Sequence, residues 1–172
     1  MGLSKGVVLS MKNRIGYGID AHQLKAGTPL IVGGVSIPFS KGSKGHSDGD
    51  VLFHAIVDAI FGSLALGDIG LHFPSNEARW KGADSRKFLD YAFRLMTDKG
   101  FLIQNIDATI ILQEPCLTSY ILQMRKNLAN ILSTDLNQIS VKATTTDKMG
   151  FIGKGEGIAA TAVVLILDNN GS

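Results

Sequence analysis

The order in which strand-like and helix-like segments follow one another limits the fold of this chain more than any other feature. A strand pattern over 14–20 and a Gly-Gly hairpin pattern over 29–38 come first, and a third strand pattern occupies 103–113. Two more strand patterns, 139–145 and 157–167, follow each other at the end. A doubly wound parallel sheet needs regular strand–helix alternation, so we predict an α+β fold with a mixed β-sheet and helices packed on one face.

Three segments with helical cap signals are expected to form the helices that cover this sheet. The expected helices run from a cap at Ser47 or Asp48 to Gly62 or Gly67, from the Asp84–Ser85 cap to Lys99, and from Pro115 to about Leu132. Two glycine-containing segments, 40–45 and 67–74, are expected to be loops.

A length of 172 residues fits one domain that buries its own core. We expect a single catalytic domain over 14–168, an N-terminal extension over 1–13 and a C-terminal tail over 169–172. Hydrophobic residues make up 45% of the chain, and a sheet covered on one side leaves an apolar face open. Both observations favour an oligomer.

Charge and cysteine content exclude several classes of protein. The net charge is +2 with its basic residues spread along the chain, which gives no footprint for nucleic acid or a membrane surface. No apolar run approaches the roughly 20 residues that span a bilayer. Cys116 is the single cysteine, so an intramolecular disulfide is impossible and a reducing compartment is expected.

A metal site is indicated by three side chains. Asp20 and His22, at the end of the first strand pattern, project from the same face of extended chain and can share one ion. His54 could supply a third ligand from the first helix, leaving one tetrahedral position open, as in catalytic zinc sites. The alternatives are a surface turn for the Asp-x-His pair and a buried core histidine for His54. Asp50, one turn before His54, could lie on the helix surface or orient an imidazole.

A second candidate site is the segment from Val141 to Gly157. Its three adjacent threonines, Asp147, two lysines and several glycines could hold phosphate and a magnesium ion. No P-loop or dinucleotide-binding fingerprint is present, and an ordinary loop is the alternative reading of this segment alone. His72 is expected to lie on the surface or to pack, and Trp80 is expected only to pack.

Six motifs in order along the chain together resemble one enzyme family, 2-C-methyl-D-erythritol 2,4-cyclodiphosphate synthase of the non-mevalonate isoprenoid pathway. The motifs are Gly-Tyr-Gly-Ile-Asp20-Ala-His22, Ile31-Val-Gly-Gly-Val-Ser-Ile-Pro38, His46-Ser-Asp-Gly-Asp-Val-Leu-Phe-His54, Gly67-Asp-Ile-Gly70, Lys81-Gly-Ala-Asp-Ser85 and Lys142-Ala-Thr-Thr-Thr-Asp147. The resemblance implies a homotrimer with its sheets towards the threefold axis and active sites between adjacent subunits.

The resemblance also implies the reaction and its metals. In the family, the 2-phosphate of 4-diphosphocytidyl-2-C-methyl-D-erythritol 2-phosphate attacks the β-phosphorus, an eight-membered cyclic diphosphate forms, and CMP leaves. Asp20, His22 and His54 would hold zinc, and Asp147 would hold magnesium or manganese. His46 and Thr145 would steady the transition state.

Substrate-binding residues carried over from the family fall into three groups. The phosphate and erythritol group is Ser47, Asp68, Ile69, Gly70, Phe73, Pro74, Ser75, Asn76 and Glu77. The cytidine group, on a neighbouring subunit, is Leu112, Gln113, Glu114, Pro115, Cys116, Leu117 and Thr118 with Thr144 and Thr146. Phe151 and Lys154 would face a cavity on the trimer axis that holds an isoprenoid diphosphate in some members.

Three positions depart from the family pattern: Asp147 replaces Glu, Lys154 replaces Arg and Cys116 replaces a frequent Lys. Two other classes remain open, a zinc-dependent phosphohydrolase with the same ligands and a non-catalytic binding protein for nucleotides or isoprenoid diphosphates. The expected location is the bacterial cytoplasm, or the plastid stroma for a plastid-bearing source.

Overall fold

The structure is a computed structural model that describes residues 13–45 and 47–169. Its main sheet has five strands in the order β4-β1-β7-β5-β6. Only β5 and β6 pair in parallel, so the predicted mixed sheet is confirmed. The strands are β1 (Asn13–Ala26), β4 (Lys41–Lys44), β5 (Phe101–Ile111), β6 (Ile139–Thr144) and β7 (Gly157–Asp168), and the predicted hairpin is β2 (Leu30–Val32) with β3 (Val35–Ile37).

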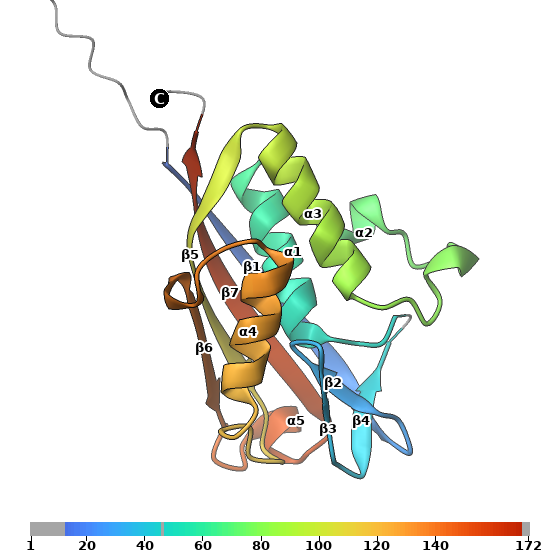
Figure 1. The fold of residues 1–172 in the computed structure, drawn as a ribbon. Coiled ribbons are helices and arrows are strands. Elements are labelled where there is room, and N and C mark those ends of the chain that lie inside the picture. The colour runs from blue at the N-terminus through green and yellow to red at the C-terminus, as the bar shows by residue number, and fades with distance from the viewer. Residues whose placement is uncertain (1–12, 46, 170–172) are drawn as a thin grey trace, which may run out of the picture.

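Three long helices lie on one face of this sheet, as Figure 1 shows, and together they give the predicted α+β fold. They are α1 (Val51–Ser63), α3 (Arg86–Asp98) and α4 (Ile121–Ile131), and the short helices are α2 (Ile69–His72) and α5 (Gly150–Gly153). Short 3₁₀ turns occupy Ala78–Trp80 and Leu136–Gln138. In the described part of the chain, no helix is both long and apolar enough to cross a membrane.

The helix α1 packs very closely on β1 because two strand residues lack a side chain. A Cβ atom at Gly16 would lie 1.7 Å from the carbonyl oxygen of Ala59, and one at Gly18 would lie 2.0 Å from that of Ala55. Such distances are far below van der Waals contact, so any larger residue would push the helix away from the sheet. The even-numbered residues of β1 therefore face α1.

The opposite face of β1 is apolar and uncovered. Ile15, Tyr17 and Ile19 are 70%, 60% and 56% exposed, and Val163, the neighbour of Tyr17 on β7, is 42% exposed. A row of large apolar side chains on one sheet face is typical of a surface that is covered in an assembly.

Several predicted elements are wrong. The segment 67–74, expected to be a loop, contains the short helix α2, which Asp68 caps by accepting from the Leu71 backbone. Residues 41–44 form the edge strand β4 instead of a loop, because backbone hydrogen bonds to β1 hold this apolar-poor segment. The cap of α1 is Asp50, whose side chain accepts from the Phe53 backbone, and not Ser47 or Asp48. Helix α4 begins at Ile121 instead of Pro115, because the preceding segment runs as a loop in which Leu117 is buried in the core.

Candidate metal centre

The strand β1 continues to Ala26, so Asp20 and His22 lie inside it and not at its end. They pair with Ala160 and Ile158 of β7 and point to the side where α1 packs. Because Gly18 lets the α1 backbone approach β1, the helix brings His54 directly over these two side chains.

Asp50 determines where α1 begins, and through it the position of His54. Its carboxylate accepts from the backbone N–H of Phe53 at 3.1 Å, of Gly33 at 2.9 Å and of Gly34 at 2.7 Å. The side chain is fully buried, and burial raises its pKa to about 6. Asp50 therefore ties the β2–β3 turn to the helix, and both roles suggested by the sequence, on the helix surface or against an imidazole, are wrong.

Three ligand atoms converge in this region. Asp20 Oδ2 lies 2.8 Å from His22 Nε2 and 2.9 Å from His54 Nδ1, and the two nitrogens are 3.2 Å apart. Tetrahedral zinc with bonds of about 2.0–2.1 Å needs ligand atoms about 3.3 Å apart. The observed triangle is only slightly smaller than one face of that tetrahedron, so the geometry fits a metal with one open position.

The electrostatics of the cluster also suit a cation. Burial disfavours the charged form of Asp20, but hydrogen bonds and charge interactions with His22 and His54 outweigh it and hold the pKa of this carboxyl well below its usual range. Asp20 is therefore an anion at any physiological pH, and the centre combines one carboxylate with two imidazoles. This is the only group of three or more potential metal ligands among residues 13–45 and 47–169.

The second ring nitrogen of His54 points away from the cluster. Its Nε2 lies 2.9 Å from Ser85 Oγ and 3.2 Å from Ser47 Oγ, and Ser85 Oγ in turn donates a short hydrogen bond to Asp48 Oδ1. Sequence reasoning assigned Asp48 and Ser85 only to helix caps. The signal that could have found Ser85 is the polar Lys-Gly-Ala-Asp-Ser motif, which has no apolar pattern of its own.

The cluster opens into a pocket of about 410 Å³. Its wall contains many of the residues predicted for the phosphate and erythritol parts of the substrate, and Trp80 and Phe88 as well. The residues predicted there that line it are Ser47, Ile69, Gly70, Phe73, Pro74, Ser75 and Asn76. Asp68 and Glu77 are not in the wall; Asp68 caps α2 by accepting from Leu71, and Glu77 pairs with Arg79.

A further residue missed from the sequence is Asp58, one turn beyond His54 on α1. Its Oδ1 accepts from the backbone N–H of Ile69 at 2.7 Å, and burial raises its pKa. This bond holds the Asp68–Gly70 turn against the helix that carries a metal ligand.

Aromatic side chains support the pocket wall. Phe73 contacts Trp80 edge-to-face, with ring centroids 5.1 Å apart, and it lies 4.5 Å from Phe88. His72 stacks on Phe61 at 4.0 Å and hydrogen-bonds to the Leu66 carbonyl. His72 therefore packs, which is one of its two expected roles. Trp80 packs as well but also lines the pocket, so the expectation that it only packs is wrong.

The segment 144–147, called the threonine segment below, lies outside the metal pocket and is largely exposed. Thr144, Thr145 and Asp147 are exposed, and Asp147 and Lys148 have positive φ angles of 50° and 66°. Thr145 Oγ1 accepts from the Asp147 backbone N–H at 3.3 Å, and the Thr146 hydroxyl donates to Met149. A single exposed carboxylate suits magnesium only if phosphate or water supplies the other ligands.

The predicted cytidine residues neighbour this segment. Gln113 and Glu114 line a pocket of about 370 Å³, the predicted cytidine pocket, together with Lys41 and Lys148, and the Gln113 side chain accepts from the Lys148 backbone. Lys154, which was predicted for the axial cavity, lines the same pocket. Other members of the cytidine group behave differently: Leu112 and Leu117 are buried in the core, Pro115 is half-buried, and Cys116 and Thr118 are exposed and in contact with each other. Phe151, which was predicted for the axial cavity, is 52% exposed.

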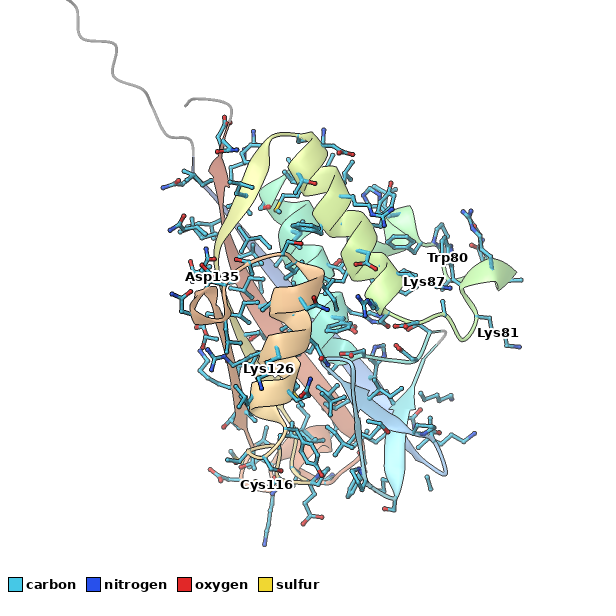
Figure 2. The ribbon with its side chains drawn as sticks, viewed as in Figure 1. Trp80, Lys81, Lys87, Cys116, Lys126 and Asp135 are labelled. Atoms are coloured by element: carbon cyan, nitrogen blue, oxygen red, sulfur yellow. The ribbon has the colours of Figure 1, made fainter. Side chains whose placement is uncertain are left out.

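The structure therefore brings the predicted residues together in two places. The pocket beside α2 and the pocket beside α5 share no lining residue, and these helices lie far apart in Figure 1. Figure 2 likewise shows Cys116 at the bottom of the view and Trp80 higher up at its right side. His46, predicted as a phosphate-side residue, lies outside the described residues.

The mixed sheet and the two-histidine, one-carboxylate centre define the class of protein as an α+β domain with a candidate metal centre. Residues 13–167 match the YgbB family model, and the chain belongs to that family. It is 56% identical over 153 residues to the 2-C-methyl-D-erythritol 2,4-cyclodiphosphate synthase of Geobacter metallireducens. The aligned residues cover 89% of this chain and 98% of that relative. The synthase of Clostridioides difficile is 52% identical over 154 residues, which are 90% of this chain and 96% of that relative. The resemblance to this enzyme family is thereby confirmed.

Solved structures show the same fold. The Plasmodium falciparum protein named IspF, in a CDP complex, has a TM-score of 0.82 at 38% identity and is matched over 92% of this chain and 97% of its own. The bifunctional IspDF of Campylobacter jejuni has a TM-score of 0.89 at 40% identity. That match covers 92% of this chain but 43% of the longer Campylobacter chain.

Proposed function

We propose that this chain is a metal-dependent cyclase that converts 4-diphosphocytidyl-2-C-methyl-D-erythritol 2-phosphate to 2-C-methyl-D-erythritol 2,4-cyclodiphosphate and CMP. The observation that carries the proposal is the convergence of Asp20, His22 and His54 in an open pocket of a chain that belongs to this family. The CDP complex of the Plasmodium falciparum neighbour supports a cytidine diphosphate ligand. The bacterial origin of the reported curated relatives favours a bacterial cytoplasm over a plastid.

The ligand set favours zinc at this centre. Two imidazole nitrogens and one carboxylate oxygen with an open position form a donor set that catalytic zinc uses. When bound, zinc would act as a Lewis acid on a phosphate oxygen, and magnesium or manganese would neutralise the diphosphate. Asp147 is the residue we assign to that second metal, with the remaining ligands supplied by substrate and water.

The protein's own part in the reaction is to position two anionic groups. We propose that Ser47 and Thr145 donate hydrogen bonds to phosphate oxygens, with His46 helping on the same side. The turn of Asp68, Ile69 and Gly70, held by Asp58, would meet the erythritol hydroxyls. Because the nucleophile and the leaving group belong to one substrate, holding their atoms in line removes much of the barrier without covalent chemistry by the protein.

We further propose that one catalytic domain over 14–168 assembles into a homotrimer with active sites between subunits. The support is twofold: the metal pocket and the cytidine pocket lie apart on one chain, and the free face of β1 and β7 is apolar. A neighbouring copy could bring its cytidine pocket to this chain's metal. Phe151 and Lys154 would then border an axial cavity open to an isoprenoid diphosphate.

Phosphorus NMR of the purified protein with the cytidyl substrate, zinc and magnesium tests the proposed reaction. We expect CMP together with a coupled pair of cyclic diphosphate signals. Linear phosphates carrying solvent oxygen would instead establish a zinc-dependent hydrolase. Intact substrate beside a folded, metal-loaded protein would establish a binding protein and refute the cyclase.

A further inference from the structure

We propose that Ser85 and Asp48 form a positioning pair that fixes the ring of His54 for metal binding. The inference rests on the metal-binding part of the proposed function. It assigns a role to two residues that do not themselves line the metal pocket. They act through hydrogen bonds in series, from the imidazole to the serine hydroxyl and from the hydroxyl to the carboxylate.

The direction of these hydrogen bonds follows from the position of the metal ligands. His54 Nδ1 faces Asp20 Oδ2 and His22 Nε2, so a metal there needs the lone pair of Nδ1. The neutral ring then carries its proton on Nε2, which lies 2.9 Å from Ser85 Oγ. A hydroxyl that accepts from Nε2 has one proton left to donate, and the Asp48 carboxylate is in place to accept it.

The carboxylate of Asp48 is itself held in position from two sides. Its Oδ2 accepts from the Ser85 backbone N–H at 3.1 Å, and its Oδ1 accepts from the Asp50 N–H at 3.2 Å. The Asp48 backbone N–H donates to the Ala83 carbonyl at 3.0 Å. These bonds join the segment before α1 to the segment before α3, so the acceptor for Ser85 cannot move independently of His54.

Ser47 also lies near Nε2, but its surroundings suit a different role. Its Oγ is 3.2 Å from Nε2, accepts from the Gly49 backbone N–H and lines the metal pocket. Ser85 is closer and fully buried, with no exposure to a ligand. Ser85 is therefore the acceptor for His54. Ser47, whose Oγ lies 3.2 Å from Nε2 and 3.2 Å from Ser85 Oγ, is the serine that faces the pocket.

A negative charge that reaches a ligand imidazole through a hydroxyl raises the basicity of the ring and restricts its rotation. Loss of such a partner outside the ligand set typically weakens metal binding about 10–100-fold. The pair therefore predicts a measurable change in zinc affinity that is independent of catalysis.

The experiment compares zinc dissociation constants of the full-length protein, measured by competition with a chromophoric chelator. The variants are Ser85→Ala, Asp48→Asn and the double variant, with Ser43→Ala as the control. Ser43 is also buried, and its hydroxyl has no hydrogen-bond partner among residues 13–45 and 47–169, so its removal tests the effect of deleting a buried serine hydroxyl elsewhere. Thermal unfolding of each metal-free protein shows whether it is folded.

We expect Ser85→Ala to weaken zinc binding about tenfold or more. Asp48→Asn should weaken it in the same direction, and the double variant should bind zinc no worse than Ser85→Ala, because Asp48 acts through Ser85. In zinc-loaded wild type, the Nε2 proton of His54 should give a downfield proton NMR signal that is lost in Ser85→Ala. Ser43→Ala should match wild type.

A folded Ser85→Ala protein with wild-type zinc affinity would overturn the proposal, as would fully additive losses in the double variant. If Ser85→Ala does not fold, the test depends on Asp48→Asn. An unchanged zinc affinity and an unchanged downfield signal in that variant would also overturn the proposal. Wild type that binds no zinc would refute the metal centre itself and this inference with it. Zinc binding with the expected pattern but without cyclisation would refute only the proposed reaction.

Discussion

The metal pocket and the threonine segment contrast in how completely one chain builds them. Asp20, His22 and His54 come from two packed elements, and hydrogen bonds already hold their ligand atoms within 3.2 Å of one another. Thr144, Thr145 and Asp147 are exposed, and the hydrogen bonds of the Thr144, Thr145 and Asp147 side chains stay among residues 144–147.

This difference indicates that the metal pocket is the preorganised half of the proposed site and the threonine segment is not. A centre of three fixed ligands can bind its metal before substrate arrives, since little entropy remains to be lost. An exposed loop with one carboxylate gains its second metal only together with phosphate groups. The proposed active site therefore joins a rigid metal half to a half that substrate and a neighbouring subunit complete.

The largest effect is expected from removing a ligand of the rigid half. His22→Ala should abolish zinc binding and lower turnover by at least about 10³-fold, because Lewis-acid assistance is worth several kcal/mol. The fold should persist, since His22 is a partly exposed strand residue. Metal content and CMP release measure the two effects. Gln23→Ala, on the exposed side of the same strand, is the matched control, and full activity of His22→Ala would reject the ligand assignment.

Removing the carboxylate of the exposed half should separate the two functions. We expect Asp147→Ala to lower turnover about 10²-fold, as loss of one electrostatic contact to the reacting phosphates does, while zinc affinity stays unchanged. Chelator competition and CMP release measure both. Asp147→Glu, which restores the family residue, should remain active and show whether the shorter side chain changes the preference between magnesium and manganese. Loss of zinc from Asp147→Ala would mean that the metal pocket depends on the threonine segment, which would contradict the comparison.

A substitution in the close contact between β1 and α1, which positions the metal ligands, is expected to have a nearly as large effect. Gly18→Ala places a Cβ 2.0 Å from the Ala55 carbonyl oxygen, so α1 must move away from β1. We expect a loss of about 3 kcal/mol in unfolding free energy and weaker zinc binding, because His54 moves with the helix. Chemical denaturation and chelator competition measure them. Gly62→Ala on the same helix, whose new Cβ meets nothing closer than 3.7 Å, should leave both intact.

The smallest effect concerns pH. Burial raises the pKa of Asp50 to about 6 from 3.8, so the folded state holds this proton more tightly than the unfolded chain. Its contribution to stability is full below about pH 4 and is lost as the pH rises through about 6, a change of about 2 kcal/mol between those values. Urea unfolding of the metal-free protein should show the advantage of wild type over Asp50→Asn shrinking by that amount. A pH-independent difference would mean that Asp50 does not titrate in this range.

Much of the fold could be predicted because local patterns and long-range packing agree. The hairpin at 30–37, the strands β5, β6 and β7 and the helix α3 all lie where their patterns indicated. The edge strand β4 could not be predicted, since pairing through backbone groups leaves no apolar pattern in Lys41–Lys44. The start of α4 was misplaced because Pro115 is a common first helical residue but here precedes a buried loop leucine, Leu117.

The metal ligands could be predicted from two-residue strand spacing and from histidine on the following helix. The roles of Asp50 and Asp48 could not, because both stand at the start of one helix and periodicity does not distinguish them. Asp50 instead binds the turn of Gly33 and Gly34, and Asp48 binds Ser85, in each case through a contact between segments far apart in the sequence. Long-range hydrogen bonds of this kind leave no local pattern.

Mixed assembly of two inactive variants tests most directly whether the two halves form one site between subunits. His22→Ala and Asp147→Ala chains, carrying different tags, are co-expressed, and assemblies that contain both are purified and assayed for CMP release. In a trimeric ring that contains both chains, about one site in three combines an intact metal half with an intact neighbouring half, so activity should return towards about one third of wild type. Mixed assemblies as inactive as the separate variants would contradict a shared site and place both halves on one chain.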